Sequence, residues 1–319
     1  MTWHGWALLP VALGLLVGNA GCSRADVYAV TGTYTGDAGD AADAGDTSDA
    51  SPPNPCAFGA LPPGDSSIKL QVGSLMRSYV LHVPPTYSGT QPAPLIVDLH
   101  GIGATGWGEL SSSTFPPMTD PDNVIIAFPD GMAGPIGTGW NMGPCCVANV
   151  DDLGFIRAVV SNIRKTACID PNRIYAVGVL TGGGMVNALG CQAADLFAAV
   201  APSAFDLLAE TVNDCKPSRP ISVVSFRGTA DTHVPYAGGA SSLVPGMPIT
   251  FLGAQATFDK WAQIDRCTST RSPEDTNGCS SYSGCADGVD VILCTKQGGP
   301  AAPVDANVAW PVLKRHSLP

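Results

Sequence analysis

The sequence predicts an α/β fold in which helices cover both faces of a mostly parallel, doubly wound sheet. Short Val/Ile/Leu runs alternate along the chain with longer segments of helical spacing, and several of these runs contain almost no polar residue. Strands that are buried between two helical layers have this composition, because neither face of such a sheet meets water. With 45% hydrophobic residues in 319, the chain has enough apolar material for one large core.

The individual elements follow from these runs. Six segments are predicted strands: Tyr79–Val83, Leu95–Leu99, Val124–Phe128, Ile174–Val179, Ile221–Phe226 and Val289–Leu293. Three segments have helical spacing: Leu153–Thr166, Met185–Ala194 and Ala254–Ile264. Asp151 and Asp152 precede the first of these helices and are plausible caps for its free N–H groups.

Charge and cysteine content narrow the class of protein. The net charge of −11 argues against a nucleic-acid partner, because phosphates are met by a basic face. Eleven cysteines are typical of an exported protein and would be a reactive liability in a reducing cytosol. Removing Cys22 from the count leaves ten, an even number that is compatible with five disulfides.

The first 55 residues predict export and attachment. Residues 7–17 form an apolar run that suits a signal-peptide core, and Asn19-Ala20-Gly21-Cys22 resembles a lipobox. We therefore expect a signal peptide over residues 1–21 and a lipid anchor on Cys22 that holds the protein on a membrane. Ordinary secretion, with Cys22 unmodified, is the alternative.

Residues 22–55 read as an acidic tether ahead of a folded domain over 56–319. Aspartates recur at every third position from Asp37 to Asp49 among Ala and Gly, so the segment has no apolar face and repels itself. Alanine also dominates where a calcium loop would need carbonyl ligands and turns, which disfavours calcium.

The motifs from Arg77 onward form a resemblance to a known family. They are RSYV at 77–80, PLIVDLHG ending at 101, AFPDG ending at 131, GWN ending at 141, the Cys145-Cys146 pair, VDDLGF at 150–155, IDPNRIYAVG at 169–178, FAAVAPSA at 197–204 and GTAD at 228–231. In this order they resemble the secreted polyhydroxybutyrate depolymerases and feruloyl-esterase-like proteins of the α/β-hydrolase superfamily. The resemblance implies the α/β-hydrolase fold and carboxylic ester hydrolysis.

The residue at the family's nucleophile position is Leu180. The resemblance places the G-x-S-x-G elbow on residues 178–182, where both glycines are present and leucine stands for serine. A leucine side chain has no hydroxyl and no lone pair with which to attack a carbonyl. Thr181 carries a hydroxyl one position later, where it is expected to point away from a base. We keep Thr181 as an alternative nucleophile beside a structural role.

The rest of the triad is only partly retained. Asp231 resembles the family's orienting acid, but without a histidine partner the favoured alternative is that it caps a turn through its own backbone contacts. Ala301 stands where the resemblance places the histidine, in a loop that is shortened before the expected terminal helix over 305–316. The other histidines of the domain are expected to be structural: His82, His100, His233 and His316.

The parts of the site that bind the electrophile are present. The resemblance implies an oxyanion hole built from the backbone N–H groups of Ile102 and Thr181. Trp107, Trp140 and Tyr236 are candidate lining residues by their loop positions, with ordinary packing as the alternative. The cysteine spacings do not match zinc sites, so we expect disulfides, two of them among Cys267, Cys279, Cys285 and Cys294, with no metal and no cofactor.

Three functions remain open. The first is an exported, envelope-attached esterase relative that has lost catalysis and binds a polyester, a feruloylated glycan or another surface ligand. The second is a hydrolase with weak or rerouted activity that uses Thr181, or a water molecule positioned by Asp231. The third is a structural surface protein whose pocket is filled by Leu180.

Overall fold

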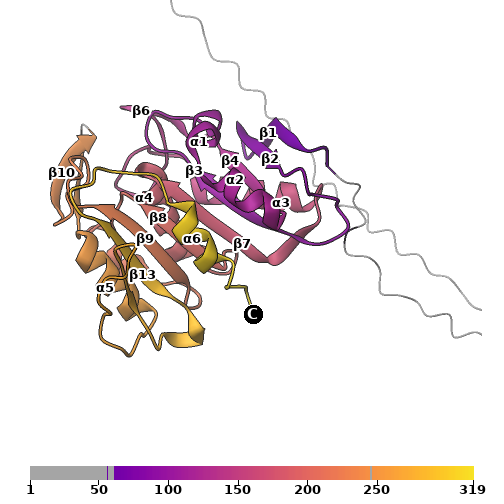
Figure 1. Cartoon of the computed structure of the whole chain (residues 1–319). Helices are drawn as coiled ribbons and strands as arrows, with labels where there is room; N and C mark the ends of the chain where they lie inside the picture. The colour runs from indigo at the N-terminus through magenta and orange to yellow at the C-terminus, as the bar shows by residue number, and fades with distance from the viewer. Residues whose placement is uncertain (1–55, 57–60, 245) are drawn as a thin grey trace, which may run out of the picture. The chain divides into compact units, whose positions relative to one another are not determined.

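The computed structural model describes residue 56, residues 61–244 and residues 246–319 (Figure 1). The predicted signal peptide, Cys22 and the acidic segment lie outside these residues. The strands are β1 (Gly64–Val72), β2 (Leu75–Val83), β3 (Ala93–Leu99), β4 (Ile125–Pro129), β5 (Met132–Gly134), β6 (Gly137–Gly139), β7 (Ile169–Val179), β8 (Ala199–Ser203), β9 (Ser222–Gly228), β10 (Gly239–Val244), β11 (Met247–Phe251), β12 (Cys279–Tyr282) and β13 (Val291–Lys296). The helices are α1 (Gly106–Ser112), α2 (Phe115–Thr119), α3 (Asp152–Arg164), α4 (Thr181–Gln192), α5 (Ala254–Ile264) and α6 (Ala306–Leu313).

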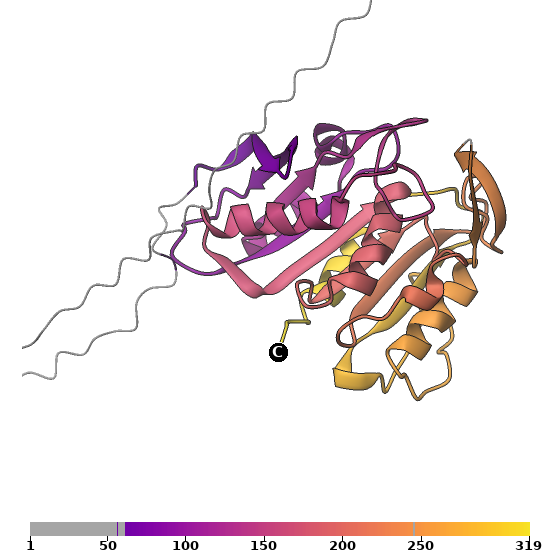
Figure 2. The same ribbon diagram turned by 180° about the vertical axis from the view of Figure 1, so that it is seen from behind.

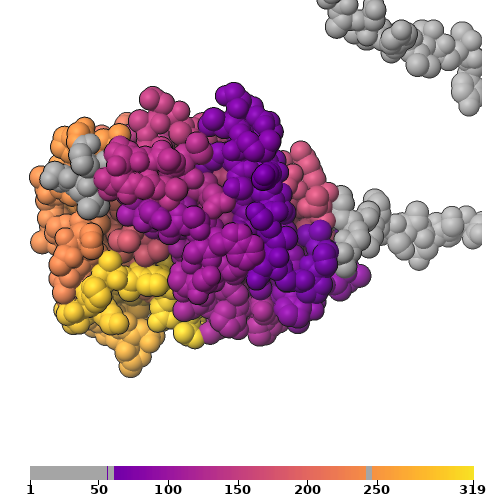
Figure 3. Space-filling model, turned by 90° about the horizontal axis from the view of Figure 1, so that it is seen from above, coloured from indigo at the N-terminus to yellow at the C-terminus, as the bar shows by residue number. Residues whose placement is uncertain are grey.

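One nine-stranded sheet organises the domain, in the order β1-β2-β4-β3-β7-β8-β9-β13-β12. The six strands from β4 to β13 run parallel, while β1, β2 and β12 pair antiparallel at the two edges. The early strands and the late strands therefore lie on opposite sides of the molecule, as the indigo and the orange-yellow surfaces of Figure 3 show. The predicted doubly wound α/β sheet is confirmed.

Helices cover both faces of this sheet. α3, α4 and α5 lie side by side on one face, which Figure 2 turns toward the viewer, and bury Phe155, Val186 and Trp261 in one core. α2 and α6 pack together on the other face and bury Phe115 and Trp310. Asp151 caps α3 as predicted, since its Oδ1 accepts from the Gly154 N–H at 2.7 Å.

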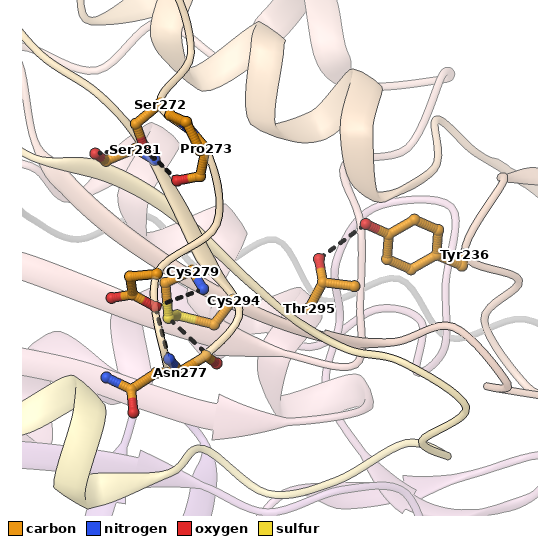
Figure 4. The surroundings of a disulfide bond; sticks show 9 residues. Tyr236, Ser272, Pro273, Asn277, Cys279, Ser281, Cys294 and Thr295 are labelled. Carbon is orange, nitrogen blue, oxygen red and sulfur yellow. Dashed lines mark hydrogen bonds between the residues drawn. A yellow bond between two sulfur atoms is a disulfide. The ribbon is translucent and has the colours of Figure 1, made fainter.

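Five disulfides join the ten cysteines that follow Cys22, which confirms the predicted number. They are Cys56–Cys168, Cys145–Cys146, Cys191–Cys215, Cys267–Cys285 and Cys279–Cys294. The last two account for the four C-terminal cysteines, and Figure 4 shows Cys279–Cys294 joining neighbouring strands. Disulfides of this density are typical of oxidising compartments. None of the helices described here is long and apolar enough to cross a membrane.

Candidate active site

The elbow at the end of β7 has the backbone shape that presents a nucleophile, with Leu180 at its apex. β7 ends at Val179, α4 begins at Thr181, and Leu180 between them has φ 51° and ψ −122°. Such a conformation is strained for any residue with a Cβ, and it persists only because the surroundings fix it. The Leu180 N–H donates to the carbonyl of Ser203 at 3.0 Å, and its carbonyl accepts from Gly184 at 2.9 Å.

The two elbow glycines are required by close backbone approach. A Cβ on Gly182 would lie 2.0 Å from the Leu99 carbonyl oxygen, and one on Gly178 would lie 2.8 Å from the same atom. No side chain fits at these distances, since the obstacle in both cases is the same backbone oxygen of β3. The elbow's geometry is therefore retained, although its apex holds a hydrocarbon side chain.

The three positions of the predicted triad meet at one edge of the sheet. The link between them is Ser203 at the end of β8: its carbonyl binds the Leu180 N–H, and its Oγ donates to the Ala302 carbonyl at 2.6 Å. The loop that carries Ala301 also contacts the turn that carries Asp231, because Ala230 donates to the Gly299 carbonyl at 2.9 Å. This convergence follows from strand order, since β7, β8, β9 and β13 are adjacent and end on the same side.

One carboxylate oxygen of Asp231 caps its own turn, and the other lies near an arginine. Its Oδ1 accepts from the N–H groups of His233 at 2.8 Å and Val234 at 3.0 Å, which is the turn-capping role foreseen as the alternative. Its Oδ2 is buried without a hydrogen-bond partner in the described chain, 4.0 Å from an amino group of Arg227. Arg227 is itself buried and ion-paired with Asp206, whose pKa burial raises to about 6.

Three of the four histidines of the described chain have structural partners. His100 is fully buried: its Nδ1 donates to the Gly101 carbonyl at 2.7 Å and its Nε2 accepts from the Gly131 N–H at 2.9 Å. Burial lowers the pKa of His100, which keeps the ring neutral in this tautomer. His82 lies between Asp65 and Asp120, His316 contacts Asp290, and the exposed His233 neighbours Thr232.

The predicted oxyanion hole lies on the turn that His100 supports. Gly103 is held at φ 75° and donates to the Thr138 carbonyl at 2.8 Å, which leaves Ile102 at the turn's edge. Among the turn, loop and cap hydrogen bonds of the described chain, neither the Ile102 N–H nor the Thr181 N–H is a donor. The Thr181 hydroxyl is buried and has no partner there either. The use of these groups in binding an anion stays a prediction.

The three aromatic residues expected to line the site differ in solvent exposure and in their contacts. Trp107 lies on α1 with 47% of its surface exposed. Trp140 is fully buried, its ring lies 5.0 Å from that of His100, and its Nε1 donates to the His100 carbonyl at 2.9 Å. The Tyr236 hydroxyl pairs with Thr295 Oγ1 at 2.9 Å (Figure 4). In this conformation Trp140 supports the turn and offers no surface to solvent.

An acidic cavity of about 370 Å³ runs along α4, beginning one turn beyond the elbow. Its wall includes Met142, Met185, Phe205 and Leu208 beside polar groups, and its charged lining residues are Asp151, Asp152, Asp206 and Asp214. No Lys, Arg or His lines it, but two of its four aspartates are ion-paired, Asp152 with Arg77 and Asp206 with Arg227. The wall of the cavity is therefore only mildly acidic. Sequence reasoning missed this cavity, because its residues come from segments far apart in the chain.

Two buried carboxyl groups lie behind the elbow. Asp98 on β3 and Glu109 on α1 line a cavity of about 10 Å³ together with Gly178 and Val179. Burial raises the pKa of Asp98 to about 7, against a hydrogen bond from Ser113 Oγ at 2.7 Å. Burial and the Asp98 charge together raise the pKa of Glu109 to about 9. The signal for this pair was an aspartate inside an otherwise apolar strand.

Comparison with known proteins finds esterases. No protein-family model matches the chain. Feruloyl esterase B of Piromyces equi is 44% identical over 247 residues, which cover 76% of this chain and 46% of that protein. Feruloyl esterase C of Emericella nidulans is 28% identical over 172 residues, 52% of this chain and 58% of that one. The chain thus spans about half the length of these curated relatives.

Solved structures of esterases share the fold. An acetyl xylan esterase from Aspergillus awamori superposes with a TM-score of 0.56 at 14% identity, covering 78% of this chain and 99% of that one. A thermostable esterase superposes with a TM-score of 0.52 at 16% identity, covering 80% and 63%. These likenesses concern the fold, whereas the relationship to feruloyl esterases rests on sequence. The described domain has the α/β-hydrolase fold, and its sequence is similar to that of feruloyl esterases.

Proposed function

We propose that this chain is a binding protein derived from a carboxylic ester hydrolase, and that it has lost hydrolysis itself. The observation that carries the proposal is Leu180, whose side chain occupies the elbow apex at φ 51°. Covalent ester hydrolysis needs an oxygen or sulfur nucleophile at this point, activated by a neighbouring base. A leucine provides neither an attacking atom nor a proton to remove.

The positions of the described histidines also support the proposal, because none of their rings forms a hydrogen bond with the elbow. His82, His100 and His316 are held by the partners given above, and none of those partners belongs to the elbow. His233 is exposed, and its ring has only the hydroxyl of Thr232 near it, at 3.5 Å. Ala301 stands in the loop beside Asp231, where a histidine would have to donate to the free carboxylate oxygen. The nearest cationic group to that oxygen is Arg227, 4.0 Å away, and no base in the described chain forms a hydrogen bond with it.

The remaining parts can still hold a ligand. The N–H groups of Ile102 and Thr181 suit an ester carbonyl or an acid, and the cavity along α4 offers apolar and neutral polar surface. We propose a polyester, a feruloylated glycan or another surface molecule as the ligand. Export and a lipid anchor on Cys22 belong to the same proposal, and the five disulfides support the export.

A weak or rerouted hydrolase is the second candidate. The observation in its favour is the buried Thr181 hydroxyl without a hydrogen-bond partner in the described chain. Thr181 is only 2% exposed, however, and its hydroxyl has no base beside it. Loss of the triad in serine hydrolases leaves about 10³–10⁴-fold acceleration over water, far below a working esterase.

Activity on short p-nitrophenyl esters and methyl ferulate, together with fluorophosphonate labelling, tests the proposal. We expect neither turnover nor labelling, and we expect Leu180→Ser alone to stay inactive because no base can activate the serine. Thr181→Ala is the matched control. Labelling of the wild-type protein that disappears in Thr181→Ala would establish the second candidate. Turnover restored by Leu180→Ser alone would show that a base is present and that its assignment to Ala301 is wrong.

A further inference from the structure

The ring of His82 on β2 lies between two carboxylates that belong to different segments. Its Nδ1 lies 2.6 Å from Oδ1 of Asp65 on β1, and its Nε2 lies 2.9 Å from Oδ1 of Asp120 in the turn before β4. Asp65 and His82 stand directly opposite each other in the β1–β2 register. One imidazole ring therefore connects the edge strand of the sheet to the turn that leads into β4.

Both contacts of His82 are hydrogen bonds only when its ring is protonated. An ionised carboxylate accepts hydrogen bonds and donates none, and a neutral imidazole has one N–H, whereas the imidazolium has two. In the neutral ring, one nitrogen would turn its lone pair toward a carboxylate oxygen at the distances given above. The arrangement of the three side chains is therefore that of a positive ring between two negative groups.

The titration of His82 is governed by these same two carboxylates. Burial lowers the pKa of His82, but the hydrogen bonds and charges of Asp120 and Asp65 outweigh burial and raise the pKa above its ordinary value. The folded protein thus holds the proton at pH values where the unfolded chain has lost it. Stability from this group is complete below about pH 6.5 and is lost as pH rises through the raised pKa.

The two partners of His82 differ in how firmly they are held. The carbonyl of Asp120 accepts from Thr86 Oγ1 at 2.8 Å and from the Asn123 N–H at 3.0 Å, so its turn has other contacts. The outer half of β1, residues 64–67, is exposed throughout, and β1 pairs with no strand but β2. Within the described chain, Asp65 has the only side chain of these four residues that forms a hydrogen bond or ion pair. A neutral ring is therefore expected to keep Asp120 and lose Asp65.

We propose that His82 is a proton-dependent clasp that holds the outer half of β1 on the sheet and releases it as the pH rises. The release is local, because Ile68, Leu70 and Val72 in the inner half of β1 pack against the core and do not depend on the clasp. The proposal does not depend on whether the elbow is catalytic.

Hydrogen–deuterium exchange of the full chain between about pH 5.5 and pH 8 tests the clasp, after correction for the intrinsic pH dependence of exchange. We expect protection of the amides in the outer half of β1 to fall by about tenfold or more across this range, because a hydrogen bond between charged groups is lost.

Asp65→Asn separates the clasp from ordinary strand pairing. The asparagine amide can donate to the bare Nδ1 of a neutral His82, so the contact no longer requires a proton. We expect the outer half of β1 in this variant to keep its protection up to about pH 8. Asp290→Asn makes the same change beside His316, which Asp290 contacts at 2.9 Å, and should leave the pH dependence of β1 as in the wild type.

Three results would overturn the proposal. The first is protection of the outer half of β1 that does not change with pH in the wild type. The second is an equal loss of protection in Asp65→Asn, which would assign the pH dependence to another group. The third is a His82 ring that titrates below about pH 6.5 when followed by NMR in the folded protein, because the clasp requires the opposite shift.

Discussion

Replacing Glu109, one of the two buried carboxyl groups behind the elbow, with glutamine should change how the free energy of unfolding depends on pH. Glu109 is 5% exposed, and burial with the neighbouring Asp98 charge raises its pKa to about 9. In the unfolded chain a glutamate ionises near pH 4.3. Between these values the folded protein holds a proton that the unfolded chain has lost, so its stability is full below pH 4 and falls as pH rises toward 9.

The size of the effect follows from one retained proton. Each pH unit in this window lowers the free energy of unfolding by about 1.4 kcal/mol per proton. Glu109→Gln keeps the shape of the side chain and carries no charge at any pH, so it removes this proton from the balance. Asp206 and Asp265 also have raised pKa values, but they remain in both proteins and cancel in the comparison. Asp98 interacts with Glu109, so the difference in slope belongs to the titration of the pair.

Urea unfolding followed by tryptophan fluorescence, with disulfides intact, measures the two slopes between pH 5 and 9. We expect the free energy of unfolding of Glu109→Gln to fall less steeply than that of the wild type, by about 1.4 kcal/mol per pH unit. Glu274→Gln makes the same change on an exposed side chain and should leave the slope unaltered. Parallel curves for the wild type and Glu109→Gln would refute the reasoning.

Two further predictions concern the elbow and the anchor. Gly182→Ala should lower the free energy of unfolding by about 3 kcal/mol or more, because its Cβ would meet the Leu99 carbonyl at 2.0 Å. Gly108→Ala, whose Cβ would meet its nearest neighbour at an ordinary 3.5 Å, should be neutral or slightly stabilising, and equal losses in urea titrations would contradict the steric argument. Cys22→Ser should move the exported protein from the membrane fraction to the soluble fraction, and an unchanged distribution would exclude an anchor at Cys22.

The sequence predicted the central strands well because they are continuous apolar runs. The structure places strands over all six predicted segments, and β3 and β4 are buried along their whole length. β8 was missed because Ala199–Ser203 consists of small residues and contains Pro202, which favour no strand by themselves. β1 was missed because it is an edge strand with mostly exposed side chains.

The site was predicted in part. The resemblance located the elbow and the loops around Asp231 and Ala301, which the strand order brings together. It could not supply Arg227 and Asp206, whose ion pair forms between residues 21 positions apart only when β9 and the segment after β8 are in place. Nor could it show that Trp140 faces inward, since the direction of a loop side chain depends on what packs around it.

The Cys56–Cys168 disulfide decides how mechanical tension enters the domain. Cys168 immediately precedes β7, a central strand that is paired with β3 and β8. A pull on the chain ahead of Cys56 is transmitted through the sulfur bridge to β7, where many hydrogen bonds must shear together. Without the bridge the same force would peel β1 from its single neighbour, β2, one bond at a time. When the Cys56–Cys168 disulfide is formed, a pull on the chain ahead of Cys56 is therefore carried by β7 and not by the β1 edge of the sheet.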